Sequence, residues 1–165
     1  MAYVTPTVVA SGDVATAAAW NVVVGDIVAG PRGVLGKATL TTAFTTSATH
    51  TTYQDTGLSA SVAYENGRIL RVSCQSHYYP SGGLQAIGIR LVRGTTTIAQ
   101  FEIGSAALAT TAVTTNYVEC FITTASATTE TFKVQIAAGS ANTAVQQYAG
   151  SPFDRFLIVE DIGAA

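Results

Sequence analysis

The most regular alternation of apolar and polar residues in the chain is Arg68-Ile-Leu-Arg-Val-Ser-Cys-Gln-Ser-His-Tyr78. In an extended backbone successive side chains point to opposite faces, so such a stretch buries one face and wets the other. The stretch follows Glu65-Asn66-Gly67, which suits a tight turn because glycine tolerates positive φ. The buried face that this pattern predicts consists of Leu70, Val72, Cys74 and Tyr78.

The two-residue period continues from Lys37 to the end of the chain, and turn residues interrupt it at short intervals. Phe132, Val134 and Ile136, for example, alternate with polar residues. We assign residues 37–165 to an all-β, antiparallel two-sheet jelly-roll sandwich, because many short strands at this spacing are typical of that fold. The predicted strands are 38–46, 50–56, 58–63, 68–78, 84–92, 97–103, 114–124, 130–138 and 154–161.

Residues 1–36 follow a different pattern, and we assign them to an N-terminal attachment arm with one short helix. Residues 14–27 place an apolar stripe on one face at helical spacing, and Gly30-Pro31 ends the segment. A helix of about 12–14 residues is marginal alone in water, so it packs either on a partner protein or on its own sandwich. The stripe consists of Trp20, Val23, Val24 and Ile27.

The composition excludes several classes of protein. Apolar residues make up 48% and charged residues only 11%, which is too little charge for a disordered tail and favours an assembly over a bare monomer. The eight lysines and arginines are scattered, so we expect no nucleic-acid partner. Residues 1–6 carry no basic signal region, and no stretch reaches the roughly 20 apolar residues of a membrane helix. We therefore expect a soluble chain that folds in a cytoplasm, with no membrane insertion.

No pattern in the sequence indicates an enzyme, a metal site or a cofactor. The two histidines, His50 and His77, have no nucleophile motif beside them, and the glutamates are dispersed along the chain. The sequence contains no Cys/His cluster and no Asp-rich calcium loop. Cys74 and Cys120 are predicted to be buried free thiols, and a disulfide between two strands is the alternative.

The last predicted strand, 154–161, is apolar on both faces. A strand of this kind is covered on both sides, so one face belongs to the core and the other meets another subunit. Leu157 and Val159 point opposite to Phe156 and Ile158. We assign Leu157 and Val159 to the subunit interface.

The candidate ligand loop is residues 77–83, which begin with His77, Tyr78 and Tyr79 and end in two glycines. Glycines let a ligand approach the backbone closely, and tyrosines bind sugars or proteins at low entropic cost. The alternative is that Tyr78 continues the apolar row of its strand and Tyr79 packs at the end of a sheet.

Three segments resemble the tumour-necrosis-factor and complement globular-head superfamily. Residues 151–161, Ser-Pro-Phe-Asp-Arg-Phe-Leu-Ile-Val-Glu-Asp, resemble its final strand. Residues 66–78 resemble the strand that follows its turn glycine, and residues 129–136 its penultimate strand. The resemblance runs over residues 38–162, and it implies a TNF-like jelly roll that assembles as a tight homotrimer.

A second resemblance concerns the arm. Residues 11–21, Ser-Gly-Asp-Val-Ala-Thr-Ala-Ala-Ala-Trp-Asn, are similar to an opening of tail, fibre and head-decoration proteins of tailed bacteriophages, and residues 157–163 resemble the close of such proteins. This implies a virion structural protein, either a homotrimeric capsid decoration or a head-fibre protein, which its N-terminal arm anchors to the major capsid or tail proteins. The alternative is a minor tail or tail-fibre tip protein that binds a host surface receptor or glycan.

Overall fold

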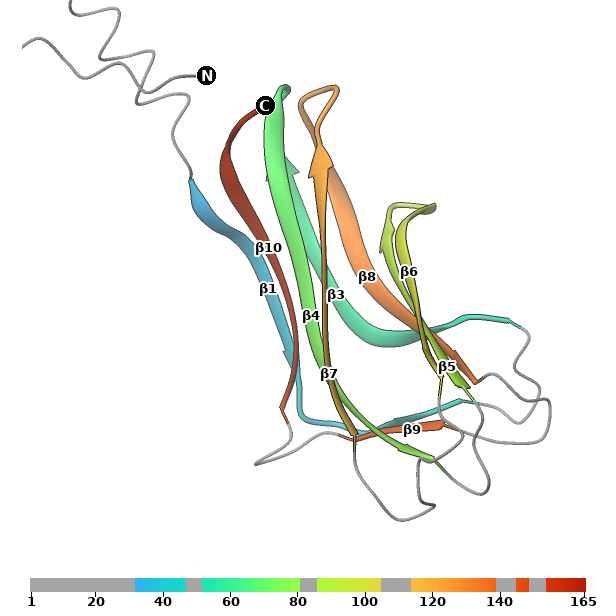
Figure 1. Cartoon of the computed structure of the whole chain (residues 1–165). Coiled ribbons are helices and arrows are strands. Elements are labelled where there is room, and N and C mark those ends of the chain that lie inside the picture. The colour runs from blue at the N-terminus through green and yellow to red at the C-terminus, as the bar shows by residue number, and fades with distance from the viewer. Residues whose placement is uncertain (1–31, 47–51, 81–85, 105–113, 139–144, 149–153) are drawn as a thin grey trace, which may run out of the picture.

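The computed structural model describes residues 32–46, 52–80, 86–104, 114–138, 145–148 and 154–165. These residues form ten β-strands (Figure 1). The first five are β1 (Gly33–Leu40), β2 (Phe44–Thr45), β3 (Gln54–Tyr64), β4 (Arg68–Pro80) and β5 (Ala86–Arg93). The others are β6 (Thr96–Gly104), β7 (Thr114–Thr123), β8 (Thr128–Ala138), β9 (Val145–Tyr148) and β10 (Arg155–Ala164).

The strands pair antiparallel in two sheets. Sheet I has the order β1-β10-β4, with β7 on the other edge of β4. On the β10 edge of β4, β9 follows beyond the start of β10 and pairs in turn with β2. Sheet II has the order β3-β8-β5-β6. Strands far apart in sequence are therefore neighbours, as in a jelly roll, and the predicted all-β, two-sheet antiparallel sandwich is confirmed.

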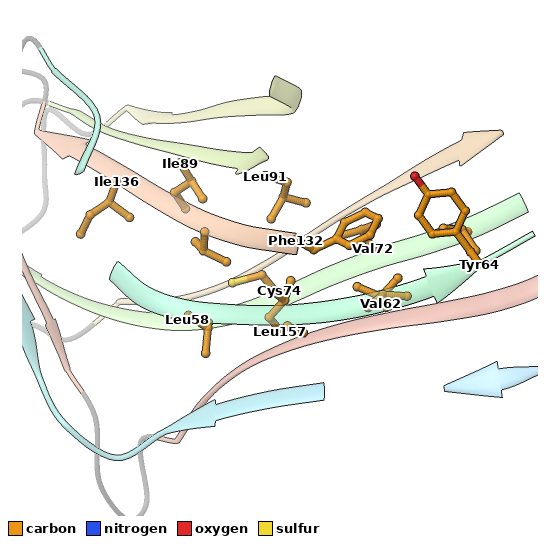
Figure 2. Packing of buried hydrophobic residues seen from close by; sticks show 14 of the residues in the cluster. Leu58, Val62, Tyr64, Val72, Cys74, Ile89, Leu91, Phe132, Ile136 and Leu157 are labelled. Carbon is orange, nitrogen blue, oxygen red and sulfur yellow. The ribbon is translucent and has the colours of Figure 1, made fainter. Parts of the chain in front are cut away.

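The hydrophobic core lies between the two sheets, and Figure 2 shows side chains from both sheets meeting there. Sheet I contributes the predicted row of β4, in which Leu70 and Tyr78 are 0% exposed. Sheet II contributes the predicted row of β8, which begins with Phe132. The Phe132 ring meets the Tyr64 ring edge to face at a centroid distance of 6.3 Å, an arrangement that aromatic pairs favour. The alternation in the sequence therefore located the core correctly.

The observed strands differ from the predicted ones in several places. The predicted strand 38–46 is divided between β1 and the short strand β2. The end of the predicted strand 50–56 and all of the predicted strand 58–63 belong to the single strand β3, which begins at Gln54. Gly57, at a φ of 80°, sits in an irregularity of the β3–β8 register and does not end the strand. Strand β9 was not predicted; it has only four residues and pairs with the end of β4. Strand β1 begins at Gly33, inside the range assigned to the arm. The predicted helix with Trp20, Val23, Val24 and Ile27 lies outside the described residues.

Both cysteines are free thiols, as predicted. Cys74 of β4 is buried in the core, and Cys120 of β7 is half-buried opposite Val72, two residues along β7 from the partner of Cys74. Burial raises the pKa of each thiol to about 11. Both groups are therefore neutral at physiological pH.

Candidate functional site

The two residues assigned to a subunit interface face the core instead. Leu157 and Val159 are both 0% exposed and belong to the core cluster, so this assignment was wrong. The alternation along β10 was correct, but a strand that is apolar on both faces does not reveal which face is inside. The inner face also holds two charged residues, Arg155 and Asp161, which the sequence gave no reason to place there.

The outward face of β10 is also apolar. Phe156 and Ile158 are half-buried on it, and Ile162 is 41% exposed. On the neighbouring strand β1, Val34 lies opposite Glu160 and is 57% exposed. The apolar surface therefore crosses from one strand to the next.

Strand β7 extends this surface on the other side of β4. Phe121 pairs with Arg71 and Tyr117 pairs with Gln75, so both point away from the core. Phe121 is 56% exposed and Tyr117 is 52% exposed. Among the described residues, the large hydrophobic side chains with high exposure all lie on the outer side of sheet I. We call this set the apolar face; it consists of Val34, Tyr117, Phe121, Phe156, Ile158 and Ile162.

Charged groups are present among the residues of the apolar face, and two of them, Arg71 and Glu160, pair with each other, whereas Lys37 of β1 is exposed opposite Ile158. Arg71 of β4 contacts Glu160 of β10, with 2.6 Å between Nη2 and Oε2. This hydrogen bond raises the pKa of Arg71. The Tyr117 hydroxyl donates to Glu119 at 3.1 Å. The pairing of Arg71 with Glu160 reduces the free-energy cost of removing water from these two groups.

The outer side of sheet II has a different character. Asp55 accepts hydrogen bonds from Lys133 at 3.0 Å and from Gln135 at 2.6 Å. The guanidinium of Arg90 lies 3.6 Å from the centre of the Tyr53 ring. These polar groups suit contact with water, so the two outer sides of the sandwich are chemically distinct.

The candidate ligand loop is only partly described. Tyr78 is 0% exposed in the core, so its assignment to a ligand loop was wrong and the alternative, a continued apolar row, is confirmed. His77 is buried on the other face of β4, with Nδ1 2.8 Å from the Thr115 hydroxyl. The Tyr79 side chain and residues 81–85 lie outside the described part.

The remaining chemical groups do not converge on one place. Within the described ranges, no three His, Cys, Asp or Glu residues lie together in a way that would hold a metal ion. Glu65 pairs with Arg32, Glu130 pairs with Arg93, and Glu160 pairs with Arg71 in separate parts of the sandwich. His50 is outside the described residues. The described part also has no helix whose length and apolar character would let it cross a membrane.

Sequence reasoning missed Val34, Tyr117 and Phe121. A signal for the last two was present, because they alternate with Val118, Cys120 and Ile122 along the predicted strand 114–124. That strand therefore carries large apolar side chains on both faces, like the last strand, although Thr115, Glu119 and Thr123 share the face of Tyr117 and Phe121. These two strands, β7 and β10, lie on either side of β4, so their outward apolar side chains fall on the same outer side of the sandwich.

No protein-family model matches the chain. No curated protein sequence matches it either. Among solved structures, the chain is similar to the tumour necrosis factor Eiger from S. frugiperda, with a TM-score of 0.53 and 13% identity over 81% of this chain and 96% of that one. It also aligns with the infectious bursal disease virus Gt strain, with a TM-score of 0.44 and 13% identity over 82% of this chain and 37% of that one. The similarity to Eiger shows that the chain has a TNF-like jelly-roll fold.

Proposed function

We propose that this chain is a structural protein of a bacteriophage virion. It forms a homotrimer that decorates the capsid or builds a head fibre, and residues 1–36 hold it on the particle. The observation that carries this proposal is the apolar face of sheet I, which belongs to strands β1, β7 and β10. The resemblance of residues 11–21 to bacteriophage head and tail proteins supports the virion assignment.

The apolar face explains why the chain assembles. A phenylalanine side chain has roughly 200 Å² of surface, so Phe121, at 56% exposure, leaves roughly 100 Å² in water. Withdrawing that area from water contributes about 2.5 kcal/mol for each copy. Tyr117 and Val34 add to this amount, and closed rotational symmetry covers the same face on every copy. Phe156 and Ile158 take the role that was predicted for Leu157 and Val159.

Light scattering on the full chain tests the homotrimer. The expected mass is three times 17.0 kDa. A Phe121→Glu substitution places a charge inside the interface and is expected to give a folded monomer, because the residue is exposed within one chain. Thr131→Glu is the matched control, since Thr131 is exposed on the outer side of sheet II. A monomeric wild-type chain at micromolar concentration, or a trimeric Phe121→Glu variant, would contradict the proposal.

Attachment through the arm has a separate test. We propose that the apolar stripe around Trp20 docks on another virion protein, so a chain that lacks residues 1–30 is expected to fold but not to join particles. The deletion keeps Arg32, which contacts the sandwich through Glu65. If the helix instead packs on its own sandwich, the shortened chain will melt at a markedly lower temperature and still join particles. That outcome would refute docking by the arm.

A further inference from the structure

The outer side of sheet I is crossed by rows of paired residues that run perpendicular to the strands. In one row, Lys37 of β1 pairs with Ile158 of β10, and Ile158 pairs with Ser73 of β4. Ser73 pairs in turn with Glu119 of β7. Strands β1 and β7 lie at opposite edges of these four strands (Figure 1). The row therefore has a cation at one edge and a carboxylate at the other.

The rows on either side also end in matching groups. In one neighbouring row, Val34 is the β1 residue and Phe121 is the β7 residue. In the other, Thr39 is the β1 residue and Tyr117 is the β7 residue. All four side chains are exposed. The β1 edge therefore presents an apolar, a cationic and a hydroxyl group at the heights where the β7 edge presents an apolar, an anionic and a hydroxyl group.

Lys37 and Glu119 are the charges of this face that lack an opposite charge in the same chain. Arg71 and Glu160 pair with each other, whereas no salt bridge among the described residues involves Lys37 or Glu119. Both are exposed, and the Glu119 carboxylate accepts a hydrogen bond from the Tyr117 hydroxyl. Covering the apolar face removes water from both groups, and a charge that is buried without a partner is strongly destabilising. Each group therefore needs a partner when the face is covered.

A rotation axis that runs along the strands brings the two edges together. Rotation carries each copy around the axis and not along it, so every row stays at its own height. When the apolar face is turned toward the axis, the β1 edge of one copy lies beside the β7 edge of the next. Residues of the same row then meet across the interface, and the groups that meet are complementary in all three rows.

We infer that Lys37 of each copy forms an ion pair with Glu119 of the neighbouring copy, and that this pair sets the register between the copies. The occupant of the apolar face is a second copy of this chain, placed head to tail. The inference rests on the homotrimer proposed above and names the contact that aligns it. A copy that slips along the strands by one row separates the lysine from the carboxylate, so the charges select one register.

An exchange of the two charges tests the pair. Lys37→Glu, Glu119→Lys and the double variant are compared with wild type by sedimentation over a dilution series, which gives the concentration at which the trimer dissociates. Each single variant sets like charges against each other and is expected to raise that concentration by roughly tenfold or more. The double variant restores opposite charges at every interface and is expected to return it to within about threefold of the wild-type value. Both positions are exposed within one chain, so every variant is expected to fold.

Lys133→Glu is the matched control, because it makes the same change in net charge on the outer side of sheet II, where Lys133 contacts Asp55. It is expected to leave the trimer unchanged. A double variant that dissociates as readily as the single variants, single variants that associate like wild type, or an equal loss in Lys133→Glu would overturn the ion pair and leave the homotrimer intact. A wild-type chain that is monomeric would overturn the homotrimer, and the ion pair with it.

Discussion

Replacing Asp161 by asparagine is expected to destabilise the sandwich strongly. The Asp161 carboxylate accepts two hydrogen bonds from Arg68, at 2.8 and 2.9 Å, and a third from the Gly163 amide at 3.0 Å. The side chains of Arg68 and Asp161 are 4% and 2% exposed, so water cannot solvate the Arg68 guanidinium after its partner has lost its charge. Removing one partner of a buried pair leaves the other charge uncompensated, which costs about 3–5 kcal/mol of unfolding free energy.

Urea denaturation measures the loss of unfolding free energy. The dependence of that free energy on urea concentration, the m-value, should be the same in the variant and the wild type if both unfold in two states. For a chain of this length, 3–5 kcal/mol corresponds to a fall in Tm of roughly 6–20 °C. Asp55→Asn makes the same chemical change in an ion pair with Lys133, in which Asp55 is 54% exposed. It is expected to cost about 1 kcal/mol or less. Equal losses for the two variants, or a loss below about 1 kcal/mol for Asp161→Asn, would refute the reasoning from burial.

Three further predictions concern two substitutions and the reactivity of the native thiols. Gly36→Ala brings a new methyl group to 2.6 Å from Val62 in the core, so it is expected to lower the unfolding free energy by about 1–3 kcal/mol in urea titration, and a neutral result would contradict the packing. Cys74 and Cys120 have pKa values of about 11, so at pH 8 neither is expected to react with a thiol reagent until urea unfolds the chain; rapid reaction in the folded state would show that they are accessible. Trp20→Ala is expected to reduce the number of copies on each particle, counted by quantitative mass spectrometry, because interface tryptophans contribute disproportionately to binding; unchanged occupancy would exclude Trp20 from the contact.

The alternation of apolar and polar residues was enough to predict the two sheets. It placed Leu70 and Tyr78 of β4, and Phe132 of β8, in the core, because in each of these strands every second residue is apolar and the residues between are mostly polar. The glycine of the turn at residues 65–67 was also predictable, and Gly67 has a φ of 70°.

The outward residues of β10 were harder to predict, for a physical reason. Strand β10 is apolar on both faces, and its inner face is the one that carries Arg155 and Asp161. Such charges usually mark an outer face, but here Asp161 is matched by Arg68, and Arg155 donates to the carbonyl of Thr42. These partners come from distant parts of the sequence, so the local pattern could not reveal that Leu157 faces the core.

A reconstruction of the virion tests the central claim most directly. The expected result is density for the TNF-like sandwich on the capsid surface in groups of three, with the apolar faces of sheet I turned toward a shared three-fold axis. Density at the tail tip would support the tail protein that the sequence left as an alternative. A virion that lacks this chain, or a single copy whose apolar face is open to solvent, would contradict the account.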